Sequence, residues 1–167
     1  MDTRIRKLDA GEYDAIVLAA AGLRRLGLDH LVTESLGPPR MLPAPGQGAL
    51  AIECRADDPV TVKVLHPLNH HETRLGVTAE RVVLATLHGG CSAPIAAWGR
   101  VSGSRLLLDA LVADVDGRHV LRASGKVDLR VSTSDLQAGG IAYDLGREVA
   151  DALLADGAAE LLATAKQ

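Results

Sequence analysis

The second half of the chain carries the pattern that most restricts the fold, because three strand-like runs lie between two long helical segments. The runs are rich in aliphatic residues and cover Ile95–Val101, Arg105–Ala113 and His119–Val127. Ser102-Gly103-Ser104 and Asp116-Gly117 separate them, and both are turn sequences typical of β-hairpins. The sequence therefore predicts a three-stranded antiparallel sheet in this half.

Two amphipathic helices are predicted on either side of these strands. Their apolar residues recur every three or four positions, which gives each helix one buried stripe. These residues are Leu75, Ala79, Val82, Val83 and Leu87 in the first helix, and Ile141, Leu145, Val149, Ala152 and Leu153 in the second. Gly157 is expected to break the second helix, and Ala158–Lys166 to form a last helical segment. An antiparallel sheet with helices on one face makes a small α+β domain.

The first half of the chain predicts a different class of fold. Ala15–Ala20 and Ala49–Glu53 are apolar runs without polar alternation, the pattern of strands that are buried on both faces of a parallel α/β sheet. A short polar helix is expected over Arg4–Gly11, and Asp58 is expected to cap a helix that begins at Pro59. A parallel sheet needs helices on both faces, and this half holds too few. We therefore expect an incomplete α/β fragment.

Composition and charge exclude several classes of protein. The 167 residues are 47% hydrophobic and 23% charged, with a net charge of −3, so we expect a globular chain with no nucleic-acid partner. The longest apolar runs, such as Ala15–Leu23, are too short to cross a membrane. No apolar segment follows the charges of Met1–Lys7, so no signal peptide is predicted. Two cysteines fit a reducing compartment, and we expect a cytoplasmic protein.

Cys91 is the candidate reactive residue of the chain. It follows Gly89 and Gly90 in a loop between the first long helix and the first strand. Two glycines free the backbone of side-chain clashes, so the loop can present a sulfur atom outward. A thiolate is a strong nucleophile. A small buried residue in a tight turn is the alternative interpretation of the same cysteine.

Several longer motifs occur in order over about the first hundred residues. They are Thr3–Asp9, Gly11–Gly27, Leu42–Leu50, Glu53-Cys54-Arg55, Asn69–Thr73, Thr78–Arg81 and Gly89-Gly90-Cys91. Together they closely resemble the porphobilinogen deaminase family, whose members are also called hydroxymethylbilane synthases. Beyond residue 100 the resemblance continues more weakly, as a pattern of strands and helices.

The resemblance implies a transferase of porphyrin, tetrapyrrole and heme biosynthesis. Family members have two α/β domains, similar to those of two-lobed binding proteins, and a small α+β third domain. They join four porphobilinogen molecules into a linear tetrapyrrole and release ammonia at each step. By this resemblance, residues 1–42 belong to the second α/β domain, 43–48 to a hinge, 49–70 to a returning segment of the first α/β domain with a linker, and 71–167 to the C-terminal domain.

The same resemblance implies a cofactor site. A dipyrromethane, built from the substrate, is held by a thioether at the position of Cys91. Arg4 and Arg25 match arginines that bind the acetate and propionate carboxylates of the pyrroles, for which a guanidinium is well shaped; a solvated surface arginine is the alternative for Arg25. Ala19 and Gly22 are expected to offer backbone groups near the ligand, and Gln47 to lie close to the pyrrole chain.

Other polar residues receive plainer interpretations. Arg81 is expected to make an interdomain or chain-path contact, with a local salt bridge as the alternative. His66, His70 and His71 have a spacing compatible with a metal site, but no cysteine or carboxylate set completes it, so no metal is expected. Cys54 ends an apolar run and is expected in a core.

The chain also departs from the family pattern. The main body of the first domain and the first part of the second have no match here, and the family's catalytic aspartate lies in that region, so no catalytic residue is assigned. Met1 stands where the family has valine, which leaves open a start assigned too late or a genuine shorter product.

Two hypotheses of function follow. In the first, the chain is one part of the synthase and is inactive alone, without bound cofactor. A separate N-terminal chain or self-association would complete the enzyme. In the second, it is a non-catalytic remnant that serves as a binding or interaction module.

Overall fold

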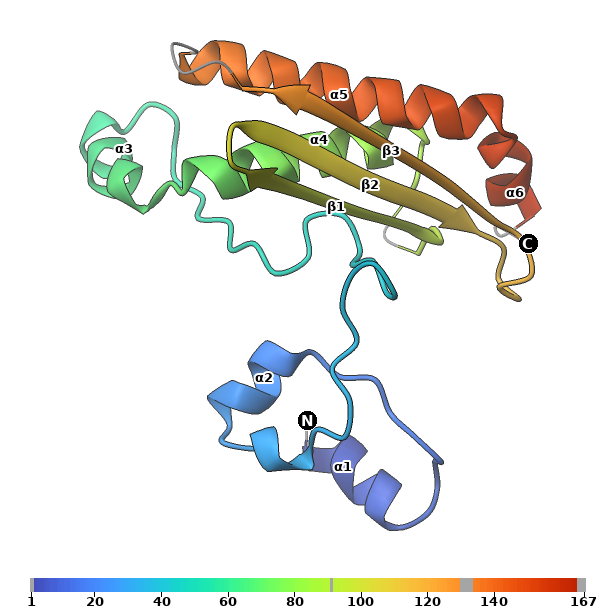
Figure 1. The fold of residues 1–167 in the computed structure, drawn as a ribbon. Helices are drawn as coiled ribbons and strands as arrows, with labels where there is room; N and C mark the ends of the chain where they lie inside the picture. Colours follow the sequence, from blue (N-terminus) through green and yellow to red (C-terminus); the bar gives the residue numbers. More distant parts are fainter. Residues whose placement is uncertain (1, 91, 130–133, 165–167) are drawn as a thin grey trace. The chain divides into compact units, whose positions relative to one another are not determined.

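The structure is a computed structural model that describes residues 2–90, 92–129 and 134–164. The chain forms two compact units, residues 1–37 and residues 38–167. The described helices include none long and apolar enough to cross a membrane. Figure 1 shows the chain with its helices and strands labelled.

The second unit is built on a three-stranded antiparallel sheet in the order β1-β2-β3. Its strands are β1 (Ile95–Ser102), β2 (Arg105–Ala113) and β3 (Val120–Asp128). Ser102 pairs with Arg105 across a two-residue turn in which Gly103 has a φ of 59°, a left-handed conformation that glycine adopts at little cost. Along β2 every second residue is buried, so one face of the sheet meets the core. The predicted sheet is confirmed.

The buried face of the sheet is covered by helices α4 (His71–Thr86) and α5 (Asp135–Ala155), followed by α6 (Ala158–Thr164). Helix α4 packs against α5 and β1, and α5 packs against β3 and β2. The largest fully buried side chains all lie between these layers; they are Leu75, Leu106, Leu108, Leu153, Val83, Val112 and Val149. Gly157, with a φ of 99°, separates α5 from α6. The small α+β domain predicted from the sequence is therefore confirmed.

The segment before this domain carries one short helix, α3 (Pro59–Leu65), and the 3₁₀ turn η2 (His66–Leu68). Asp58 caps α3 as predicted, because its carboxylate accepts hydrogen bonds from the Thr61 N–H at 3.1 Å and the Thr61 hydroxyl at 2.7 Å. The apolar side chains of α3 are exposed, Val60 at 73% and Val64 at 69%. Helix α3 therefore has the predicted N-cap, but none of its residues is buried.

The first unit contains α1 (Asp2–Asp9), α2 (Ala20–Arg25) and the 3₁₀ turn η1 (Asp29–Leu31). Among its described residues, Leu23 is the one buried side chain. The unit therefore has local helical structure, including the short polar helix expected near the start, with little apolar core.

The two apolar runs predicted as parallel strands, Ala15–Ala20 and Ala49–Glu53, do not form strands in this structure. Ala20 begins α2, and every strand of the described residues belongs to the C-terminal sheet. A strand buried on both faces exists only where neighbouring strands supply its hydrogen bonds and helices cover it. The described chain supplies neither around these runs, so the two strand predictions are wrong for this structure.

The expectation that Cys54 lies in a core is wrong for the same reason. Cys54 is exposed, as is Leu50 at 96% and Ile52 at 60%. Residues 50–54, predicted as part of a covered strand, have no regular secondary structure and are exposed to solvent.

Candidate functional site

The loop that follows α4 is shaped by backbone geometry that suits few residue types. His88 has a φ of 51°, a left-handed conformation that residues other than glycine seldom adopt. The Gly89 N–H donates to the Leu84 carbonyl at 3.0 Å and closes the end of the helix. A Cβ added at Gly89 would lie 2.9 Å from the side chain of Leu84, whereas Gly90 has open space around it. The two glycines therefore have different roles. Gly89 permits close packing against Leu84, whereas the space beside Gly90 is open.

Position 91 is flanked on both sides by tethered residues. The Ala93 N–H donates to the Gly90 carbonyl at 3.0 Å, and the Ile95 N–H donates to the Ala93 carbonyl at 2.8 Å. Cys91 itself, the predicted attachment residue, lies outside the described residues. The described residues before and after it belong to a short connection that leaves α4 and enters β1.

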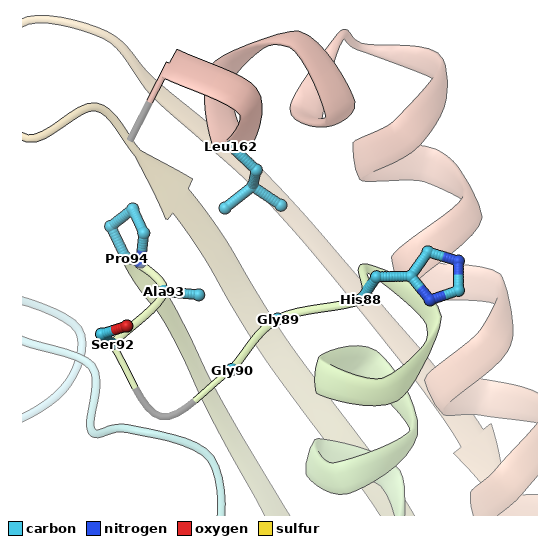
Figure 2. A pocket seen from close by; sticks show the side chains of 7 residues that line it. All are labelled: His88, Gly89, Gly90, Ser92, Ala93, Pro94 and Leu162. Carbon is cyan, nitrogen blue, oxygen red and sulfur yellow. The ribbon is translucent and has the colours of Figure 1, made fainter. Parts of the chain in front are cut away.

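A pocket of about 500 Å³ opens at this loop, and Figure 2 shows its lining. The lining residues are His88, Gly89, Gly90, Ser92, Ala93, Pro94 and Leu162, the last of which projects from α6 toward the loop. This described lining holds no arginine or lysine. A ligand with several carboxylates, attached within the loop, would need cations from another part of the protein.

Arg4 and Arg25, the two predicted carboxylate-binding residues, lie in the first unit on α1 and at the end of α2. Both side chains are exposed, and neither has an ion pair or hydrogen bond among the described residues. Arg24 differs, because its guanidinium lies 3.7 Å from the Asp29 carboxylate. Arg24 thus has a local partner, whereas Arg4 and Arg25 keep their hydrogen-bond donors available within the described chain.

Ala19 and Gly22 lie at the start of α2, where several of their backbone groups form hydrogen bonds within the helix. The Gly22 N–H and the Leu23 N–H both donate to the Ala19 carbonyl, at 3.0 and 3.3 Å. The Ala19 carbonyl and the Gly22 N–H therefore serve the helix in this structure. The expectation that the two residues offer backbone groups to a ligand stays a prediction.

Gln47 lies in the predicted hinge, in a turn where its N–H donates to the Ala44 carbonyl at 3.0 Å. The flanking Gly46 and Gly48 have φ values of 76° and 84°, which glycine alone adopts readily. Gln47 lines a second, more open pocket of about 350 Å³ against α4 and β1. Residues 45–48 therefore form a turn within the second unit.

The most unusual polar residue of the second unit is Glu80, to which the sequence pattern alone assigned no role. Its side chain is buried, with 5% of its surface exposed. One carboxylate oxygen accepts a hydrogen bond from the Gly46 N–H at 2.6 Å, and the other accepts from the Gly99 N–H at 2.7 Å. Burial raises the pKa of this carboxyl, and the two backbone hydrogen bonds oppose that rise. A helical-wheel signal was present, because Glu80 lies four residues after buried Gly76 and three before buried Val83.

The histidines and Arg81 have limited roles in the described structure. His70 caps α4 through its ring, which accepts from the Thr73 N–H at 3.3 Å. The described residues contain no group of three or more His, Cys, Asp or Glu side chains able to hold a metal ion. Arg81 is exposed, and within the described chain it forms no local salt bridge.

Comparison with known proteins assigns both parts of the chain to one family. Residues 1–63 match the family model described as "Porphobilinogen deaminase, dipyromethane cofactor binding domain", and residues 74–155 match "Porphobilinogen deaminase, C-terminal domain". The chain is 47% identical over 162 residues to a porphobilinogen deaminase of Trichlorobacter lovleyi. The match covers 97% of this chain and 49% of the relative, so the chain spans about half the length of that curated protein. The chain belongs to the porphobilinogen deaminase family.

Proposed function

We propose that this chain supplies the cofactor-bearing loop and part of the carboxylate-binding surface of a hydroxymethylbilane synthase. That enzyme joins four porphobilinogen molecules into a linear tetrapyrrole and releases ammonia at each step. The observation that carries the proposal is the match of residues 1–63 to the family's cofactor-binding domain, together with the pocket lined by Gly89, Gly90 and Ser92. We propose a cytoplasmic location, because two cysteines in 167 residues fit a reducing compartment.

The residues of this chain fit a dipyrromethane cofactor. Cys91 is the proposed thioether residue, and the pocket beside its loop has room for a planar ring system. The cofactor's carboxylates need cations, which the described pocket lining lacks and which the exposed Arg4 and Arg25 offer. When bound, the cofactor supplies the pyrrole end from which the product chain is extended. Gln47, Ala19 and Gly22 are proposed to lie along the pyrrole chain.

The proposed domain boundaries follow the same reasoning. Residues 1–42 and 49–70 are proposed to complete two α/β domains whose other strands this chain does not supply, with 43–48 between them. The exposed apolar side chains of residues 50–64 support this assignment, because a strand or helix of an α/β domain is covered on its apolar face.

We propose that these 167 residues do not turn over porphobilinogen by themselves. Neither Asp9 nor Asp14 stands in a motif that matches the family's catalytic aspartate. General acid–base catalysis contributes about 10²–10⁴-fold to a rate, and we assign no residue of this chain to supply it. The part of the family protein that these residues do not span is the proposed partner.

A binding or interaction module without turnover is the second candidate. The observation that favours it is the contiguous hydrophobic core of the α+β domain, which is built from residues of this domain. The two candidates differ in whether addition of an N-terminal half gives turnover of porphobilinogen.

Porphobilinogen consumption by the purified chain separates these candidates. We expect no consumption by the chain alone, and consumption when the N-terminal half of the Trichlorobacter lovleyi relative is co-expressed with it. The Cys91→Ser variant with the same half is the matched control and is expected to be inactive. Turnover by the chain alone contradicts the proposal, and the absence of turnover with a folded, bound N-terminal half favours the interaction module.

A further inference from the structure

The edge of the C-terminal sheet is covered by the segment that the resemblance assigned to a hinge. Strand β1 is an edge strand, because its one neighbour in the sheet of the described residues is β2. The N–H groups of Ala97 and Gly99, two residues apart, point away from β2. The Ala97 N–H donates to the Pro43 carbonyl at 3.0 Å, and Figure 1 shows the chain before α3 running beside β1. An edge strand with unpaired N–H groups is a site for further pairing, which this segment prevents in part.

The Glu80 carboxylate binds the next outward-facing N–H group of β1, that of Gly99. It accepts from the Gly99 N–H at 2.7 Å with one oxygen and from the Gly46 N–H at 2.6 Å with the other. A single side chain of α4 thus joins the helix, the edge strand and the 43–48 segment. Hydrogen bonds to a carboxylate are shorter and about twice as strong as those between neutral groups.

The burial of the Glu80 carboxylate indicates that its hydrogen bonds have a specific role. A carboxylate with 5% of its surface exposed loses most of its hydration, and an apolar residue at the same position would avoid that cost. What the carboxylate adds is specificity, because it accepts two N–H groups that come from segments 53 residues apart in the chain, at 46 and 99. The positive φ of Gly46 allows the backbone to turn its N–H toward Glu80.

We propose that Glu80 is a positioning residue that fastens the 43–48 segment to the edge of the C-terminal sheet, so that this segment moves as part of the C-terminal domain. The consequence for Gln47 rests on the proposed function: its place beside the pyrrole chain is then set by Glu80, through the neighbouring Gly46. The fastening itself depends only on the contacts within the second unit.

Hydrogen exchange of the whole chain, followed amide by amide, tests the proposal. In Glu80→Gln the side chain keeps its shape, but one of its two polar atoms becomes an NH₂ donor that cannot accept from an N–H group. We expect the Gly46 amide to exchange at least about tenfold faster than in the parent chain, which corresponds to about 1.4 kcal/mol. The amides of the α5 core are expected to keep their protection.

Glu72→Gln is the matched control. Glu72 lies on the same helix and lines the same pocket, but it is exposed and bonds neither glycine amide. We expect unchanged exchange at Gly46 in this variant. Equal acceleration of all core amides in Glu80→Gln would show a merely structural role and overturn the proposal.

If Glu80→Gln does not fold, the parent chain still decides the question. Protection of the Gly46 amide comparable to that of Gly99 supports the fastening, and exchange of Gly46 at the rate of an open loop overturns it. Neither readout involves the cofactor or turnover, so failure of the fastening is distinguishable from failure of the proposed function.

Discussion

At the scale of single residues, Glu80 shows how two opposing effects act on one group. Removal from water disfavours the charged carboxylate, whereas the N–H groups of Gly99 and Gly46 favour it. The first effect is larger, so the pKa lies above its ordinary value of 4.5. His70, Glu72 and Arg100 line the same pocket and are the other titratable groups that face it. Arg100 is engaged elsewhere, with its guanidinium 2.6 Å from the Asp109 carboxylate.

This shift predicts how stability depends on pH. A carboxyl group whose pKa is raised by folding stabilises the folded state below pH 4.5, and this contribution is lost as the pH rises through the raised pKa. We therefore expect the free energy of unfolding of the parent chain, relative to Glu80→Gln, to fall as the pH increases across that window. Urea unfolding of both chains at several pH values measures the difference. A difference that grows in favour of the parent chain with rising pH contradicts the assignment.

At the scale of elements, the close approach of α4 and β1 depends on a pair of glycines. Gly76 on the helix faces Gly99 on the strand, and a Cβ added at Gly76 would lie 2.5 Å from the Gly99 carbonyl oxygen. The same approach brings Glu80, one helical turn after Gly76, to the strand edge. Packing of the core and placement of the Glu80 carboxylate are therefore parts of one contact.

Substitution of either glycine should disturb this contact. We expect Gly76→Ala to lower the free energy of unfolding by about 1–3 kcal/mol, because overpacking a tight contact forces backbone shifts. Gly140→Ala is the matched control, since Gly140 lies in α5 with open space around it, and there alanine is expected to stabilise the helix by about 0.5–1 kcal/mol. Thermal or urea unfolding measures both. Equal stability of Gly76→Ala and the parent chain would show that the helix and strand can separate without cost.

The elements also show which parts of the fold follow from local sequence. Arg105–Ala113 forms β2 with the predicted bounds, and Asp58 caps α3, because alternation, hairpin turns and capping are set by neighbouring residues. Ala15–Ala20 forms no strand, because a doubly buried strand depends on partners far away in sequence or in another segment. The glycine loop could be predicted because its signal is local in the sequence. The Glu80 contacts could not be predicted, because Gly46 and Gly99 come close to Glu80 only in the folded unit.

At the scale of the whole molecule, the two units differ in how much core they hold. Residues 38–167 contain a contiguous cluster of buried aliphatic residues between the sheet and its helices. In residues 1–37 Leu23 is the one described side chain that is buried. Stability that comes from apolar burial is therefore concentrated in the second unit.

Limited proteolysis is expected to follow this difference. Cleavage should remove residues 1–37 first and then enter the exposed stretch around Leu50 and Ile52, which leaves a resistant fragment that begins near α4. Mass spectrometry of the digestion products identifies the fragment. Equal resistance of both units would contradict this account, unless the chain self-associates, which size-exclusion chromatography of the same sample detects.

We propose that Cys91 is the attachment residue for dipyrromethane and that loading requires an N-terminal half. The intact mass of the chain, purified alone and after co-expression with the N-terminal half of the Trichlorobacter lovleyi relative, tests it most directly. We expect the unmodified mass for the chain alone. With the partner half we expect an increment of two linked pyrroles, kept in Cys54→Ser and lost in Cys91→Ser. An increment on the chain alone, an increment that survives Cys91→Ser, or none with a bound partner half would each contradict the claim.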